Sequence, residues 1–166
     1  MPDRVVRRVL ACVEIADRGD PDMSWAIAFA QQLGAELILF TVIDRPAMVA
    51  LIGRHGHADG RGHSHGRGPS GTLTASLVED AKRVLQRIVD QAASAGVLAR
   101  GHAVVSEEVP EEILKEAIVQ QVDLILIRPS VHGGFLQHLM RSTVEEILGA
   151  APCAVLVVKS SRAVLR

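Results

Sequence analysis

Apolar residues follow two alternating patterns along the chain. Short runs rich in apolar residues predict strands at residues 8–13, 36–43, 98–105, 123–127 and 154–158. The run at 123–127 is nearly continuous, as expected of a strand that is buried on both faces of a parallel sheet. Segments with apolar residues at helical spacing separate these runs, and the longest extends from Leu73 to Ala95. Strands and helices in alternation predict an α/β fold, a doubly wound parallel sheet of five strands with helices on both faces.

Local start and stop signals indicate where the helices begin and end. Pro21 suits the first turn of the first helix, and Gly34 predicts the end of that helix. Gly96 closes the long helix. A helix that opens at Pro110 is expected to face inward through Ile113, Leu114, Ala117 and Ile118.

The stretch from Asp123 to Lys159 reads as a strand, a glycine-containing loop, a helix and a strand. Ser142 followed by Glu145 forms a capping box, which predicts that the last helix begins there. A loop that leads from a buried strand to a helix N-terminus presents free N–H groups and the positive end of the helix dipole. This arrangement suits an anion such as phosphate.

These residues resemble the universal stress protein family, whose pattern is a strand, Gly-x-x-Gly, nine residues, Gly-Ser/Thr, a helix and the ending Ala-Pro-Cys-Pro-Val-Leu-Val-Val. Here the ending is Ala151-Pro152-Cys153-Ala154-Val155-Leu156-Val157-Val158. Counting back from it, the family's three glycines fall on Arg128, Val131 and Arg141. In members that bind ATP, those glycines let the backbone wrap the phosphates, which a valine or an arginine resists. The resemblance therefore implies a degenerate nucleotide site.

The resemblance covers about the whole chain and implies an adenine nucleotide alpha-hydrolase-like fold with the strand order 3-2-1-4-5. In that order the first and fourth strands end side by side at the topological switch point, where such folds bind ligands. Glu14 stands where family members have an aspartate near the bound adenosine, and we expect it to meet Arg128 there. The candidate nucleotide-binding residues are Glu14, Val42, Arg128, Val131, Gly133, Gly134, Arg141, Ser142 and Thr143.

One segment, residues 53–71, interrupts the single domain of residues 1–166 with seven glycines and four histidines. Ordering so many glycines is entropically unfavourable, which predicts a mobile surface loop. Two alternatives stay open. The pairs His55/His57 and His63/His65 could ligate zinc, nickel or copper, or the loop could respond to pH as its histidines gain charge below about pH 6.5.

Composition excludes several classes of function. Apolar residues make up 48% of the chain and aromatic residues only 2%, so the core must be aliphatic. A net charge of -1 gives no electrostatic footprint for nucleic acid. The apolar runs are far shorter than the roughly 20 residues that span a bilayer, and we expect a cytoplasmic protein without membrane insertion. Cys12 and Cys153 are expected to be small buried hydrophobes rather than a disulfide or a redox pair.

The sequence as a whole predicts a regulatory or protective module of universal stress type, which is not an enzyme and requires no cofactor. Its last strand is an unprotected apolar edge, which predicts a homodimer through Ala154, Val155, Leu156, Val157 and Val158. A regulatory role also implies a protein partner of unknown identity. The alternatives are a variant nucleotide sensor or slow ATPase that uses ATP and Mg²⁺, disfavoured by the lost glycines, and metal handling by the histidine loop.

Overall fold

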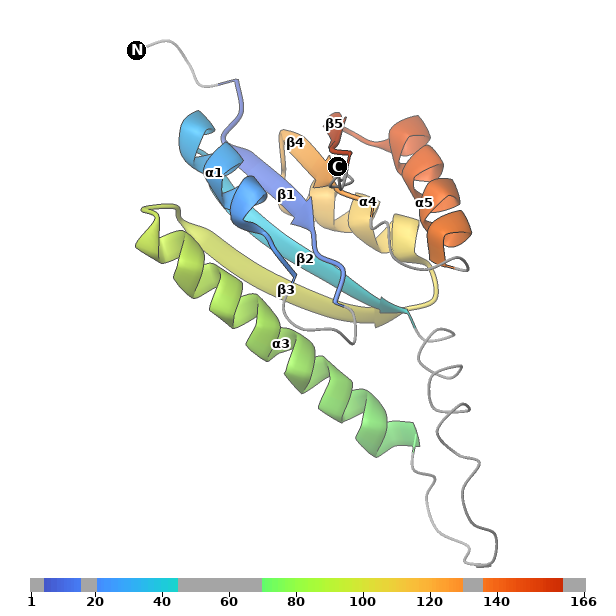
Figure 1. The fold of residues 1–166 in the computed structure, drawn as a ribbon. Helices are drawn as coiled ribbons and strands as arrows, with labels where there is room; N and C mark the ends of the chain where they lie inside the picture. The colour runs from blue at the N-terminus through green and yellow to red at the C-terminus, as the bar shows by residue number, and fades with distance from the viewer. Residues whose placement is uncertain (1–4, 16–20, 45–69, 130–135, 160–166) are drawn as a thin grey trace, which may run out of the picture.

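Five parallel strands form one sheet in the order β3-β2-β1-β4-β5, as predicted (Figure 1). The computed structural model describes residues 5–15, 21–44, 70–129 and 136–159. The strands are β1 (Arg8–Cys12), β2 (Glu36–Asp44), β3 (Ala99–Ser106), β4 (Leu124–Ile127) and β5 (Ala154–Val157). The helices are α1 (Ser24–Leu33), α3 (Ser70–Ser94), α4 (Val109–Val119) and α5 (Leu136–Ala150). From β1 to β3 the chain adds strands on one side of β1, and then β4 and β5 are added on its other side. The boundary between β1 and β4 is therefore the topological switch point of the sheet.

Each face of the sheet is covered by its own apolar cluster, because successive residues of a strand point to opposite faces. One face of the central strands packs against α1 and α3 through residues such as Val9, Leu37 and Ile88. The other face packs against α4 and α5 through residues such as Leu10, Phe40 and Ile147. Most of the largest fully buried side chains are aliphatic, as the composition predicts.

Both glycine stops are confirmed, but the predicted start of α1 is wrong. Gly34 (φ 60°) and Gly96 (φ 73°) have the left-handed conformation that ends a helix. The helix α1 begins at Ser24, so Pro21 lies outside it. The carboxylate of Asp22 accepts hydrogen bonds from the Ser24 N–H (3.0 Å) and the Ser24 hydroxyl (2.6 Å). These bonds hold the chain just before the first turn, where the N-cap residue Met23 makes no side-chain cap bond.

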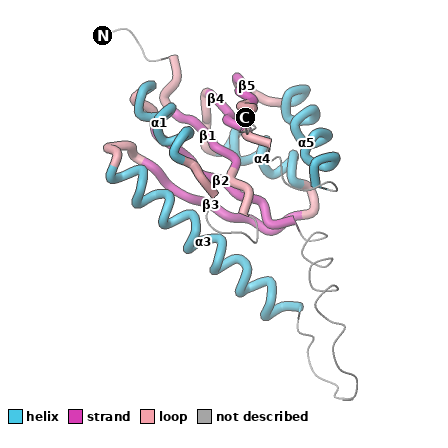
Figure 2. Tube along the Cα trace, viewed as in Figure 1, coloured by secondary structure: helices cyan, strands magenta, loops and turns pink. Residues whose placement is uncertain are grey.

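Two apolar residues of the helices are exposed, and one of them, Ile118, was expected to face inward. Ile118 is 62% exposed, because the buried face of α4 runs through Ile113, Glu116 and Ala117 and leaves Ile118 to one side. Leu77 is 38% exposed. It lies in the N-terminal turns of α3, which lean away from the sheet in Figure 2.

The described residues include no helix that is both long and apolar enough to cross a membrane.

Candidate functional site

A cleft of about 90 Å³ opens where β1 and β4 end side by side. Its lining is mostly apolar and comes from the ends of β1, β2 and β4 and from α4 and α5. The lining residues are Cys12, Val13, Glu14, Phe40, Val42, Val109, Ile113, Ile127, Arg128, Thr143, Val144 and Ile147. The fold thus brings four of the candidate residues, Glu14, Val42, Arg128 and Thr143, to one place.

Two polar atoms in this lining are buried without a hydrogen-bond partner among the described residues. They are Oε2 of Glu14, which follows β1, and Nε of Arg128, which follows β4. A buried polar atom left unpaired destabilises a fold by about 1–3 kcal/mol. Most such atoms in proteins are paired with protein or water. The described lining of the cleft thus carries one unpaired acceptor and one unpaired donor. This pair indicates a place where a ligand or a water molecule could bind.

Arg128 is held by α1 rather than by Glu14. Its guanidinium carbon lies 5.3 Å from the centroid of the Trp25 ring, a cation–π contact that contributes roughly 1 kcal/mol. We expected Glu14 and Arg128 to meet, and both do line the cleft. However, no ion pair joins them within the part of the chain that the structure describes. The Trp25 ring thus contacts the guanidinium without an ion pair between Arg128 and Glu14.

A second carboxylate contributes to the charge around Arg128. Hydrogen bonds from the Ser24 hydroxyl and the Ser24 N–H lower the pKa of Asp22, and the positive charge of Arg128 lowers it further. Asp22 is therefore ionised at neutral pH. One guanidinium is thus set against two carboxylates at this end of the sheet, those of Asp22 and Glu14.

The cysteine that lines the cleft, Cys12, is expected to be a poor nucleophile. Cys12 is half-buried, and burial raises the pKa of its thiol to about 12. Burial also raises the pKa of Cys153, with a smaller contribution from the negative charge of Asp123. Both thiols are free. Because the thiolate is the nucleophile, neither side chain is suited to covalent catalysis at neutral pH.

The predicted capping box is wrong, because α5 begins at Leu136 and Ser142 lies inside the helix. Residues 136–141, Leu-Gln-His-Leu-Met-Arg, contain no glycine or proline and include several strong helix formers. Nothing in this segment stops the helix before Ser142. Inside an α-helix, the N–H groups of Ser142 and Thr143 bond to the carbonyls four residues earlier. They are not the free N–H groups that were expected to bind an anion.

The remaining candidate residues lie beyond what the structure describes. Val131, Gly133 and Gly134 fall outside the described residues, as do His55, His57, His63 and His65. Arg141 belongs to α5, but its side chain is not described. Among the described residues, no group of three or more His, Cys, Asp and Glu side chains could hold a metal ion.

The last strand lies at an edge of the sheet, where it pairs with β4. Ala154 and Leu156 are exposed, whereas Val155 and Val157 are partly buried. Val158 falls just after the strand, although its N–H still donates to the Ile127 carbonyl at 2.8 Å. An apolar residue at the exposed edge of a strand is the feature on which the predicted dimer depends.

Sequence reasoning did not identify Trp25 and Asp22 as parts of this region. Trp25 is the single tryptophan of a chain that is very poor in aromatic residues, and it follows directly on an Asp-Met-Ser segment that can cap a helix. A single tryptophan next to a helix start could have identified this region from the sequence. The contact with Arg128 was not predictable, because it depends on how α1 lies against the end of β4.

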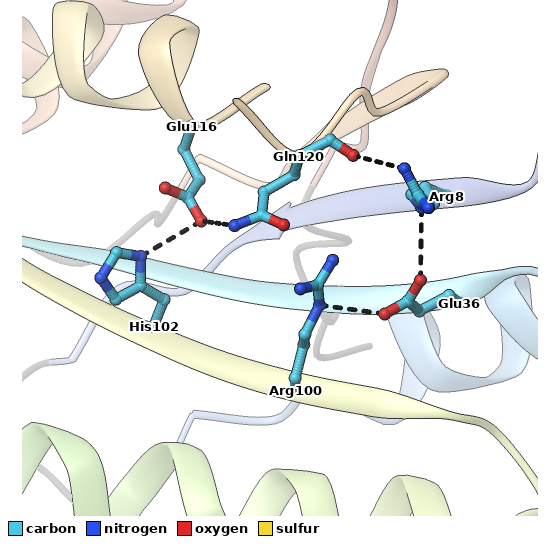
Figure 3. A network of polar contacts seen from close by, with 6 residues as sticks. All are labelled: Arg8, Glu36, Arg100, His102, Glu116 and Gln120. Carbon is cyan, nitrogen blue, oxygen red and sulfur yellow. Dashed lines mark hydrogen bonds and ion pairs between the residues drawn. The ribbon is translucent and has the colours of Figure 1, made fainter. Parts of the chain in front are cut away.

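A second polar cluster lies toward the N-terminal ends of the strands, away from the cleft (Figure 3). It joins Arg8, Glu36, Arg100, His102, Glu116 and Gln120. The Glu36 carboxylate pairs with Arg8 at 3.4 Å and with Arg100 at 2.9 Å. The buried Glu116 carboxylate contacts His102 at 3.1 Å and accepts a hydrogen bond from Gln120 at 2.9 Å. Each of these residues has a partner within the network, which therefore links β1, β2 and β3 to one another and to the C-terminal end of α4.

Comparison with known proteins identifies the family. The chain is similar in fold to the hypothetical protein MJ0577, with 21% identity, a TM-score of 0.66 and coverage of 96% of this chain and 99% of that one. It is similar to a universal stress family protein from Burkholderia pseudomallei, with 21% identity, a TM-score of 0.65 and coverage of 96% and 100%. A family protein from Arabidopsis thaliana, solved with AMP bound, has 12% identity, a TM-score of 0.58 and coverage of 93% and 92%.

Among curated protein sequences no significant match is found. The sequence profile of the universal stress protein family matches residues 6–159, which include every described strand and helix. The chain therefore belongs to the universal stress protein family.

Proposed function

We propose that this protein is a regulatory, non-catalytic universal stress module with a degenerate nucleotide site. Its cleft would hold the nucleoside end of an adenine nucleotide but bind a triphosphate weakly. The observation that carries this proposal is Arg128, whose side chain lines the cleft at a position where the family's ATP motif has glycine. A solved family protein with AMP bound supports an adenine ligand at this fold.

The nucleoside end of the site is supported by the character of the lining. Phe40, Val42 and Ile113 provide apolar surface in the cleft, which suits a planar base. Glu14 has a buried carboxylate oxygen that can accept a hydrogen bond from an amine or a hydroxyl of the ligand.

The phosphate end of the site is supported much less. The N–H groups of Ser142 and Thr143 lie within α5, where the helix uses them for its own hydrogen bonds. Asp22 and Glu14 oppose the accumulation of negative charge near Arg128. These features favour weak ATP binding and no hydrolysis, and they weigh against the alternative of a slow ATPase.

A mass spectrum of the small molecules released from the pure, full-length protein tests the proposal. We expect no stoichiometric ATP, and adenosine or a monophosphate is the adenine ligand that the cleft could retain. Stoichiometric ATP or ADP would contradict the proposal. Steady turnover of Mg-ATP by the pure protein would contradict its non-catalytic part.

We also propose that two copies associate through β5, with Leu156 at the centre of the contact. An exposed apolar edge strand can pair with its own copy about a two-fold axis, which closes the interface and prevents further growth. The cytoplasm is the compartment that we propose for this dimer, because two free thiols suit a reducing environment.

A further inference from the structure

Arg128 is the one basic side chain among the described residues that line the cleft. Its Nε atom is buried without a hydrogen-bond partner, while the Trp25 ring holds the guanidinium from α1. In the polar network of Figure 3, by contrast, each arginine has a carboxylate partner. A guanidinium that is fixed in place but has an unused N–H is prepared to bind an oxyanion, since its donors match phosphate and carboxylate oxygens.

The capacity for negative charge at this site is small. Glu14 lines the cleft and Asp22 interacts electrostatically with Arg128, so two carboxylates are already set against the single guanidinium. The free backbone N–H groups that would share the charge of a longer phosphate chain are absent at Ser142 and Thr143, because these residues lie inside α5. One phosphate group can use Arg128, but further phosphates would meet repulsion and find few donors among the described residues of the cleft.

The size of the cleft also favours a small ligand with one phosphate group. Its volume of about 90 Å³ is well below the roughly 300–1,000 Å³ of pockets that enclose a whole ligand. The described part of the cleft therefore suits one end of a nucleotide rather than the whole ligand, and its apolar lining suits the base. The anionic end would then lie beside Arg128, whose side chain is part of the lining.

We propose that Arg128 makes the cleft selective for an adenine ligand with a single phosphate group, over both adenosine and ATP. This inference rests on the proposed function, because it needs the nucleoside end of the cleft. Among the described residues that line the cleft, Arg128 supplies the one charge-assisted hydrogen-bond donor group for the phosphate. Glu14 and Asp22 set the limit on how much negative charge the site accepts.

Calorimetric titration of the full-length protein with adenosine, AMP and Mg-ATP tests this selectivity. We expect AMP to bind about tenfold more tightly than adenosine, as one charge-assisted hydrogen bond allows, and about tenfold more tightly than ATP. Arg128→Gln should weaken AMP binding to the level of adenosine and leave adenosine within about twofold. Arg83→Gln removes the same charge from the exposed face of α3 and should change neither affinity.

A second readout locates the phosphate. Trp25 is the single tryptophan of the chain, so its fluorescence reports on the surroundings of Arg128. We expect AMP to change this fluorescence more than adenosine does. If Arg128→Gln does not fold, Arg128→Lys keeps the charge without the planar fork and should give an AMP affinity between those of the native protein and adenosine.

Two outcomes would overturn the inference in different ways. If adenosine and AMP bind equally to the native protein, or if ATP binds as tightly as AMP, Arg128 does not select for one phosphate group. The cleft would then still be a nucleoside site. If neither adenosine nor AMP binds at millimolar concentration, the cleft is not a nucleoside site, and the proposed function fails together with this inference.

Discussion

Individual residues of the cleft determine its chemistry, and Cys12 illustrates how strongly burial acts on them. Because burial raises the pKa of this thiol to about 12, almost none of it is thiolate at neutral pH. We expect Cys12 to react with iodoacetamide far more slowly in the folded protein than in urea, as followed by mass spectrometry of the labelled peptides. Rapid labelling of Cys12 in the native state would show that the cleft is open or the thiol activated.

Asp22 gives a prediction about pH at the same scale. Its folded-state pKa is lowered, so its contribution to stability is present above the ordinary carboxyl pKa and is lost as the pH falls through the lowered value. Asp22→Asn should therefore lower the melting temperature at pH 7, and the difference from the native protein should shrink as the pH falls below the ordinary carboxyl pKa. A difference that stays constant with pH would mean that Asp22 does not act through its charge on Ser24.

Among the elements, the last helix accounts for the largest difference between expectation and structure. Since α5 starts at Leu136, Arg141 lies in a helix interior, where glycine is less favourable than other residues by up to about 1 kcal/mol. Arg141→Gly should destabilise the protein by about that amount in urea unfolding. Gly149→Ala is the matched control, because an added methyl group meets nothing within 4 Å and should stabilise the same helix. A neutral or stabilising effect of Arg141→Gly would place that residue in a loop.

Elements with a strong pattern were predictable, and the details that depend on contacts were not. All five strands were expected from apolar runs in the sequence, whereas their order was expected only from the family resemblance. The start of α5 was missed because a motif centred on Ser142 was given more weight than the helix propensity of residues 136–141. The inward face of α4 was misassigned at Ile118, because the buried position was taken by Glu116, whose carboxylate has partners in His102 and Gln120.

For the whole molecule, the predicted dimer depends on the exposed edge of β5. Leu156→Lys should shift the protein toward monomer in sedimentation velocity experiments at tens of micromolar, because a charge would be buried in the apolar contact. Leu98→Lys is the control, since Leu98 is 73% exposed and precedes β3 at the opposite edge of the sheet. A native monomer, or a dimer that withstands Leu156→Lys, would place the interface elsewhere or exclude it.

The central claim is that this family member has kept the cleft and lost the triphosphate site. Calorimetric titration of the native protein with Mg-ATP, beside a variant that carries glycine at positions 128, 131 and 141, tests it most directly. We predict no micromolar binding by the native protein and a gain in ATP affinity in the glycine variant, whose backbone can again wrap the phosphates. A micromolar or tighter dissociation constant for ATP in the native protein would contradict the account.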